Sequence, residues 1–498
     1  MRLSAMAFAA ILPAAPVFAE VSADEVWEAW KQSLTVTSQN ALKIQSEEKT
    51  ADTLRLRGVT LSFQDSGTEV TWELGDLEFI EQSDGTVQVS VPASLPMSIT
   101  VVEGEEEFEF SMVVTHEALA ITASNATGPL VHDVAADSLA ISFGASDELP
   151  DNVELVGALG VAGFSGLISA EGEDVRRQKF NMRAEEFTYD FSATEPSEGS
   201  FNTRMLSTEV TMSGSGSFPA DGEEMNPALL IANPDYGVLA NFGTSGTGIT
   251  MDFRDAEGEG TMQISAGKGA LDFALENGSL RYGGSSSNIS FSGQFPGVPL
   301  PISASVARSS YDIAMPLVAQ EEESDFLLGL VVDGLEIDPF FWNLFDPAEI
   351  LARDPATVSL KIAGMGRWLV DILDPIASAE LDEEDIPAEF SNLTISDLEV
   401  SVAGAQLTGA GDFTFDNSDL FTFDGFPAPS GALDLRLLGG NGLIDSLAQM
   451  GLLPQEQALG ARMMMGLFMT PGEGEDEMTS KIEVQSSGEV FANGQRIR

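Results

Sequence analysis

The sequence predicts a β-rich α+β protein: a long, curved antiparallel sheet with an N-terminal amphipathic helix and a C-terminal pair of helices. The main observation is that apolar and polar residues alternate with a period of two over most of the chain. Helical spacing of apolar residues is prominent mainly near the two ends. Dipeptides that suit two-residue hairpin turns separate the alternating runs at Asp84-Gly85, Asn277-Gly278 and Asn493-Gly494.

Composition sets limits on function. The chain has 498 residues, 43% of them apolar, which is long and apolar enough for sizeable cores. It carries 79 Asp and Glu against 23 Lys and Arg, a net charge of −56, and this field repels nucleic acid. The absence of cysteine excludes disulfides and thiolate chemistry. Only His116 and His132 could supply imidazole, and both are expected in ordinary packing or surface roles, so no cofactor is expected.

The first residues have the features of a signal peptide. Arg2 precedes an apolar run, and Val17-Phe18-Ala19 places small residues before a cleavage site. We expect residues 1–19 to be removed after Ala19 and the protein to be periplasmic. No later apolar run reaches the roughly 20 residues of a membrane-spanning helix, so no transmembrane anchor is expected in the mature chain.

The remaining regions follow in order. Residues 20–50 are expected to hold the first helix, which Ser22 and Glu25 open as a capping box. Residues 51–225 form a first β-rich region. Residues 226–320 are expected to hold a short helical insertion, over 226–242, and a second β-rich region. Residues 321–498 form a β-rich region that ends in the helix pair.

Three further helix starts are predicted. Pro339 opens a short aromatic helix with Asp338 as its cap. Asn441 is expected to cap a helix that stops at Gly451, and the last helix is expected from Pro454 to about Met469.

Motifs that would indicate catalysis are incomplete. No serine is flanked as in a nucleophile elbow, and Gly267-Lys268-Gly269 lacks the Ser or Thr of a phosphate-binding loop. A non-catalytic protein is therefore favoured. A carboxylate-dependent hydrolase stays an alternative because the many acids offer many pairs. The acidic loops favour solubility, with a divalent-cation site as the alternative.

One stretch has a more specific pattern, an aromatic helix followed by two Asp-Pro turns. Its signature residues are Trp342, Phe345, Asp346, Pro347, Arg353, Asp354 and Pro355. With Met450–Ala458 and Ala492–Arg496, this stretch resembles the exported, mainly alphaproteobacterial family catalogued as domain of unknown function 2125. The resemblance implies an uncharacterised periplasmic protein with no assigned catalytic residues.

Taken by themselves, the signature residues favour a structural role. Asp346-Pro347 and Asp354-Pro355 are turn formers. Trp342 and Phe345 are expected to pack on the sheet, and Arg353 is expected to pair with an acid. The alternative is a partner-binding surface.

The last predicted helix is apolar on nearly every side, which favours a core helix inside the curved sheet. The alternative is an adaptable contact surface for lipid or a partner protein. Its residues are Met463, Met464, Met465 and Phe468.

Three functions follow from this sequence. The first is a soluble cell-envelope protein that binds or passes an apolar, lipid-like ligand. The second is a structural or protein-interaction module with a dry core, and the third is the carboxylate-dependent hydrolase. A continuous apolar trough favours the first, a closed core the second, and two inward carboxylates in a cleft the third.

Overall fold

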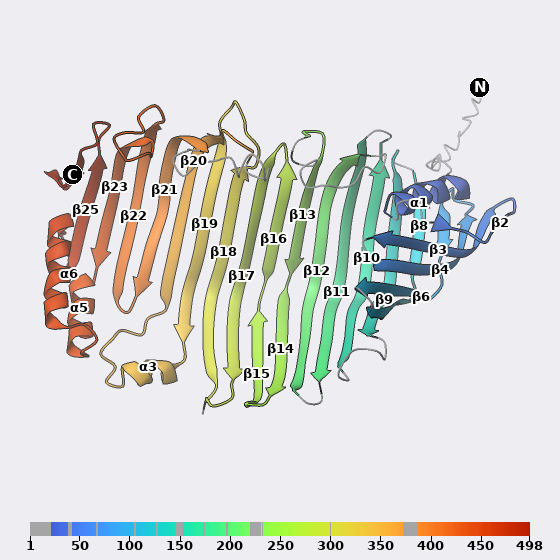
Figure 1. The fold of residues 1–498 in the computed structure, drawn as a ribbon, viewed down its shortest axis with the longest axis horizontal. Helices are drawn as coiled ribbons and strands as arrows, with labels where there is room; N and C mark the ends of the chain where they lie inside the picture. The colour runs from blue at the N-terminus through green and yellow to red at the C-terminus, as the bar shows by residue number, and fades with distance from the viewer. Residues whose placement is uncertain are drawn as a thin grey trace, which may run out of the picture.

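The computed structural model describes residues 21–37, 42–65, 68–103, 106–125, 128–145, 153–172, 175–195, 198–219, 231, 233–298, 300–371 and 387–498. Within these residues, a single sheet of 27 strands runs the length of the molecule, and its strands pair antiparallel (Figure 1). The predicted fold class is confirmed. The expected signal peptide and its cleavage site lie outside the described residues, as do residues 226–230 and 232 of the expected helical insertion.

The N-terminal part combines one helix with short and medium strands. The helix α1 spans Ala23–Thr37 and lies across β3 and β4. The strands are β1 Leu42–Lys43, β2 Ser46–Lys49, β3 Thr53–Asp65, β4 Thr68–Glu81, β5 Val87–Ser90, β6 Ser94–Glu103, β7 Glu106–Glu117, β8 Ala120–Ser124 and β9 Leu130–Ala145.

The central part consists of long strands side by side. Two long strands each pair with two short strands that lie end to end: β12 pairs with β13 and β14, and β17 pairs with β15 and β16. The strands are β10 Glu154–Glu171, β11 Val175–Glu195, β12 Gly199–Pro219, β13 Gly237–Thr244, β14 Gly246–Asp255, β15 Gly258–Ala266, β16 Gly269–Glu276, β17 Ser279–Gln294, β18 Ile302–Pro316 and β19 Ser324–Ile337.

The short helix expected within residues 226–242 does not extend into the end of that segment. Residues 237–242 belong to β13 because Val238, Ala240 and Phe242 alternate with the period of a strand.

The C-terminal part continues the sheet and contains the predicted helix pair, which four further strands follow (Figure 1). None of the helices in the described ranges is long and apolar enough to cross a membrane. The elements are α3 Pro339–Phe345, β20 Ala356–Trp368, β21 Ala388–Val402, β22 Ala405–Asp416, β23 Ala428–Leu438, α5 Gly440–Gln449, α6 Gln455–Phe468, β24 Thr470–Pro471, β25 Glu477–Val484, β26 Val490–Ala492 and β27 Gln495–Arg496.

Local sequence signals explain several boundaries. Ser22 and Glu25 form the expected capping box: the Ser22 N–H donates to the Glu25 carboxylate (2.8 Å) and the Glu25 N–H donates to Ser22 Oγ (3.3 Å). The Asp338 carboxylate accepts from the Phe340 N–H (2.7 Å) at the start of α3. Asn277 and Gly278 have φ of 52° and 68°, as their hairpin turn requires.

The expected cap of α5 was wrong. Gly439, and not Asn441, occupies the N-cap position. Because glycine has no side chain, the N–H groups of the first turn are bonded by an acceptor that is distant in sequence. The Asp476 carboxylate accepts from the backbone N–H groups of Asn441 (3.1 Å) and Gly442 (2.8 Å). These bonds lower the pKa of Asp476, although its desolvation acts in the opposite direction.

The side chains of the sheet sort into one apolar and one polar side. Residues paired across antiparallel strands point to the same side, and alternate residues of one strand do so too. Tyr189 of β11 faces Leu159 on β10 and Met205 on β12. Met205 in turn faces Ile249 on β14, which faces Ile264 on β15. One side of the sheet is therefore apolar across these strands.

A line of backbone irregularities, here called the seam, crosses the central strands. Residues with left-handed φ lie on it at Gly163 (59°), Glu209 (47°), Asn288 (50°) and Gly334 (67°). At the seam two successive residues of a strand point to the polar side, as in a β-bulge. The residues on the apolar side therefore have even numbers on one side of the seam and odd numbers on the other. Each strand thereby keeps the same side apolar along its whole length.

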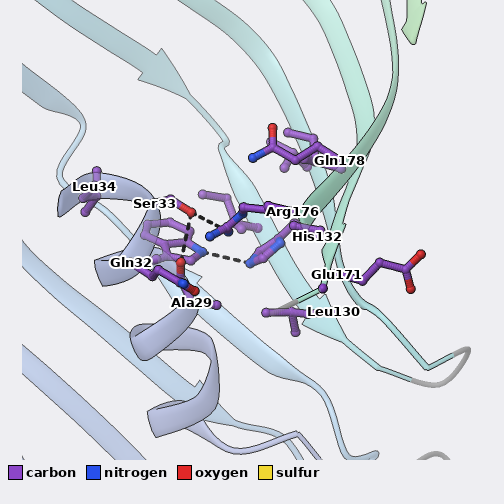
Figure 2. Close-up of a pocket in the computed structure, with 15 residues that line it drawn as sticks. Ala29, Gln32, Ser33, Leu34, Leu130, His132, Glu171, Arg176 and Gln178 are labelled. Carbon is purple, nitrogen blue, oxygen red and sulfur yellow. Dashed lines mark hydrogen bonds between the residues drawn. The ribbon is translucent and has the colours of Figure 1, made fainter. Parts of the chain in front are cut away.

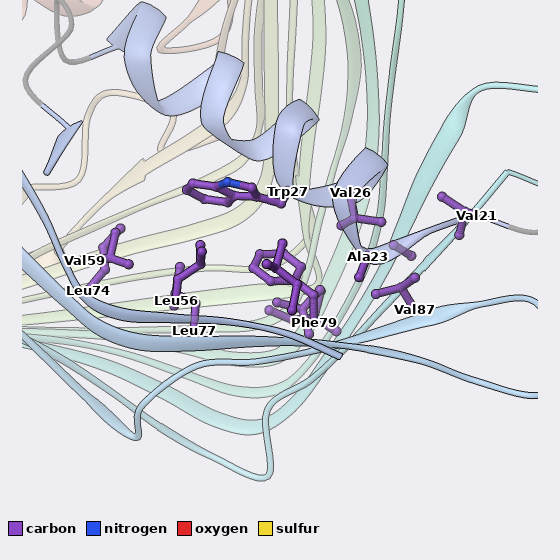
Figure 3. Packing of buried hydrophobic residues seen from close by; sticks show 14 of the residues in the cluster. Val21, Ala23, Val26, Trp27, Leu56, Val59, Leu74, Leu77, Phe79 and Val87 are labelled. Carbon is purple, nitrogen blue, oxygen red and sulfur yellow. The ribbon is translucent and has the colours of Figure 1, made fainter. Parts of the chain in front are cut away.

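The tightest core lies under α1 (Figure 3). Val26 and Trp27 of the helix pack on the apolar side of the sheet against Leu54, Leu56 and Phe79, which are almost fully buried. Each such side chain contributes roughly 1.5 to 3 kcal/mol on burial. A second, smaller buried cluster joins Ile231, Leu275 and Leu317.

Candidate functional site: an uncovered apolar face with an end pocket

Beyond α1, the apolar side of the sheet is half exposed; we call this surface the apolar face. Twelve of its large side chains are between 36% and 44% exposed, whereas those under α1 are buried. The residues with this exposure on the apolar face are Phe201, Met212, Phe242, Leu271, Tyr282, Leu328, Leu330, Leu335, Ile337, Val358, Val400 and Val402.

Strand register shows that the apolar face is continuous. Leu330 of β19 is paired with Tyr311 on β18 and with Leu360 on β20. Leu360 is paired with Leu398 on β21. Farther on, Leu433 of β23 faces Ile482 of β25. The same side of the sheet is therefore apolar from the central strands to the C-terminal end.

The opposite side carries ion pairs. Arg204 donates to Asp190 (2.6 Å), and Arg281 donates to Asp312 (3.1 Å). These side chains point away from the apolar face because their neighbours in each strand belong to it. Among the described residues, the sheet thus has a charged surface on one side and a largely uncovered apolar surface on the other.

The apolar face is hollowed near the seam. A depression of about 280 Å³ is lined by Phe242, Leu271, Ile289 and Tyr311, among others. A hydrogen bond with Tyr282 raises the pKa of Tyr311 to about 12, so this phenol stays neutral at physiological pH.

At the N-terminal end of the apolar face, α1 and β8–β11 enclose the end pocket, a cavity of about 370 Å³ (Figure 2). Its walls are mostly apolar and include Leu130, Val134 and Ile168. Polar side chains also line it, among them His132 of β9 and Arg176 and Gln178 of β11. This volume is within the range of small-molecule sites.

Two hydrogen bonds tie α1 to the pocket wall. The indole Nε1 of Trp30 donates to His132 Nε2 (2.8 Å). The Arg176 guanidinium donates through Nη2 to Ser33 Oγ (2.7 Å). Burial lowers the pKa of His132, so the imidazole is neutral near pH 7, and its accepted bond places the proton on Nδ1. Burial also lowers the pKa of Arg176.

The methionine-rich helix α6 was expected as a core helix inside the curved sheet, and the structure places it at the surface. Only Ala458 of α6 is buried, and Met463 and Met464 are 69% and 56% exposed, so α6 is not a core helix. The Oγ of Ser480, which shares the apolar side with Leu435, donates to the carbonyl of Phe468 (2.6 Å). The C-terminal end of α6 therefore lies on the apolar side of the sheet. Met465 and Phe468 are half-buried.

The signature residues gather around α3 and the loop that follows it. Asp346 is 1% exposed and accepts from the N–H groups of Ile350 and Leu351 (both 2.9 Å). Arg353 lies over the Trp342 ring at 5.9 Å and pairs with Glu349 (3.6 Å).

The expected packing of Phe345 on the sheet was wrong: it is 44% exposed and contacts Trp342, because α3 is a short helix with no buried residue. Pro347 follows Asp346, and Asp354 and Pro355 precede β20.

The sequence reasoning missed the end pocket. Trp30, His132 and Arg176 come from three segments that only the fold brings together. A signal was present: His132 alternates in phase with Leu130 and Val134, and Arg176 is in phase with Phe180. A polar residue in the apolar phase of a strand indicates a polar group on the apolar side of a sheet. Among the described residues, no group of three or more His, Asp or Glu could hold a metal ion.

The fold and the site define a class: an antiparallel sheet protein whose apolar face, within the described residues, is covered by helices only near its two ends. The family model described as "Uncharacterized protein conserved in bacteria (DUF2125)" matches residues 225–496, and the chain belongs to this family. The search of curated proteins found no match.

Among solved structures, the crystal structure of BauA, the ferric preacinetobactin receptor from Acinetobacter baumannii, is similar at a TM-score of 0.17 and 9% identity. The match covers 89% of this chain and 75% of that one. A likeness at this level carries no argument about fold or function.

Proposed function

We propose that the protein is a non-catalytic protein of the bacterial cell envelope that binds or passes lipid acyl chains along its apolar face. The observation that carries the proposal is the continuous row of half-exposed Leu, Phe, Met and Val side chains on one side of the sheet. Large exposed apolar surfaces mark sites of interaction, because leaving such side chains in water forfeits the free energy of burial.

The dimensions of the apolar face suit long apolar chains. Strands about 4.8 Å apart make the stretch from β9 to β25 on the order of 60 Å long. That is about twice the roughly 30 Å hydrocarbon thickness of a bilayer. The face therefore has room for several acyl chains, or for one that moves along it.

Charge argues against a second copy of the chain as the occupant. Each copy has a net charge of −56, so placing two copies face to face brings two strongly negative fields together. A lipid chain adds no charge to the face. A face-to-face dimer is accordingly an outcome that the experiment below must distinguish.

The location in the periplasm rests on the N-terminal sequence. Sequencing protein from the envelope fraction is expected to find Glu20 as the first residue, and an intact Met1 would contradict export. The dry-core module and the carboxylate-dependent hydrolase stay alternatives, and no pair of described carboxylates lines the end pocket.

The test compares equal charge changes on the two sides of the sheet. Leu330→Glu places a carboxylate on the apolar face, and Ser310→Glu places one on the polar side of the neighbouring strand. Both proteins are purified from the envelope without detergent, and lipid per protein is measured by extraction and mass spectrometry. We expect bound lipid to fall several-fold only in Leu330→Glu. A lipid-free wild type with the mass of a dimer would mean that a second copy covers the face.

A further inference from the structure

Within the described residues, the end pocket holds a cation, the Arg176 guanidinium, that forms no ion pair. Arg176 is on the apolar side of β11, in register with Phe218 of β12. One of its nitrogens donates to Ser33, but its buried Nε has no hydrogen-bond partner. No described carboxylate forms an ion pair with it, although other arginines of this acidic chain form ion pairs on the polar side.

The nearest acid on the pocket wall does not compensate for this charge. Glu171 belongs to the polar phase of β10, and its carboxylate points away from Arg176 (Figure 2). A half-buried guanidinium without an anion costs solvation free energy, and an oxyanion at this position would recover it through charge-assisted hydrogen bonds. The side chain therefore has an unfilled capacity to bind an anion.

The surroundings of Arg176 suit an amphiphile more than a free anion. Leu130, Val134 and Ile168 line the pocket and share the apolar side with Ile141 and Leu159 farther along β9 and β10. A chain attached to an anion at Arg176 can thus leave the pocket directly along the apolar face. The indole of Trp30, fixed by its bond to His132, closes the wall on the helix side.

We propose that the end pocket binds the oxyanion headgroup of an acyl-chain amphiphile, with Arg176 as its counter-ion and Gln178 as a further polar group in the wall. This inference rests on the proposed function, because the acyl chain would lie on the apolar face. It adds a direction to binding: the anionic end lies under α1, and the chain extends toward the central strands.

The experiment uses 9,10-dibromostearate and its methyl ester, which share a chain and differ in headgroup charge. Bromine quenches tryptophan fluorescence, and Trp30 lines the pocket. We expect the wild type to bind the acid at least tenfold more tightly than the ester at pH 8. Arg176→Gln should remove the preference, so that the affinity for the acid falls to that for the ester. The matched control is Arg177→Gln, because Arg177 is the next residue and points to the exposed polar side.

The outcomes separate the two proposals. Equal binding of acid and ester by the wild type would overturn the headgroup inference alone, whereas no binding of either would overturn the proposed function. A preference that survives in Arg176→Gln would also overturn the role of Arg176. Should that variant fail to fold, Arg176→Lys keeps the charge and is expected to keep part of the preference. Inorganic phosphate that binds as tightly as the acid would show a site for free anions and contradict the amphiphile.

Discussion

At the scale of single residues, the polar groups on the apolar side of the sheet distinguish the end pocket. His132 and Trp30 satisfy each other with one hydrogen bond, whereas Arg176 retains an unpartnered nitrogen. Asp346 shows the opposite arrangement. Burial alone would raise the pKa of this carboxyl, but the donated N–H groups and the charge of Arg353 lower it overall. Asp346 thus has a full set of structural partners, and Arg176 does not.

The buried imidazole makes stability depend on pH. Burial lowers the pKa of His132 in the folded state, while the unfolded value is about 6.5. Above pH 6.5 neither state binds the proton, and as the pH falls the unfolded state binds it first. Stability therefore decreases from about pH 6.5 down to the folded pKa, by at most about 1.4 kcal/mol per pH unit.

His132→Gln keeps an acceptor for Trp30 and removes the titration. Urea unfolding at pH 7 and pH 5 should show a smaller loss of stability for the variant than for the wild type. An identical loss would mean that His132 is protonated equally in the folded and unfolded states.

At the scale of elements, the sequence predicted strands well because their alternation is local. The sequence also contains the change of phase at the seam. Along β11 the apolar residues are even-numbered at Phe180 and Met182 but odd-numbered at Phe187 and Tyr189. What it could not supply is the alignment of these changes across neighbouring strands, which depends on register. The capping of α5 by Asp476 was equally out of reach, because the carboxylate comes from the turn before β25, 34 residues away from Gly442.

The exposure of α6 leads to a prediction for that helix. Met464 is 56% exposed, so Met464→Glu should change the free energy of unfolding by less than about 0.5 kcal/mol. If α6 contributes to the lipid surface, the same variant should carry less co-purified lipid than the wild type. Gln457→Glu, an equal charge change at another exposed position of α6, is the control. A loss of several kcal/mol from Met464→Glu would show that this side chain is buried in solution.

At the scale of the whole molecule, a single layer of strands gives the protein much surface and little core. Sequence alone predicted the architecture, since the periodicity of two extends almost from end to end. It left open whether the apolar sides of the strands meet in a closed core or remain uncovered. That depends on how many strands join one sheet, and no local pattern contains this information.

The net charge should make stability depend on salt. With a charge of −56, the folded chain repels itself, and screening reduces this repulsion. The melting temperature is therefore expected to rise between about 10 mM and 150 mM salt, as the Debye length falls from about 30 Å to 8 Å. Calorimetry at the two concentrations measures this directly. An unchanged melting temperature would show that the charges are too dispersed to matter.

The most direct test of lipid binding on the apolar face uses the absence of cysteine in the chain. Leu330→Cys places a fluorescent label on the apolar face, and Lys361→Cys places one on the polar side of the adjacent strand. Vesicles or micelles that contain brominated phospholipid are then added, and quenching of each label is measured. We predict strong quenching at position 330 and little at position 361. Equal quenching at both positions, or none at position 330, would contradict this prediction.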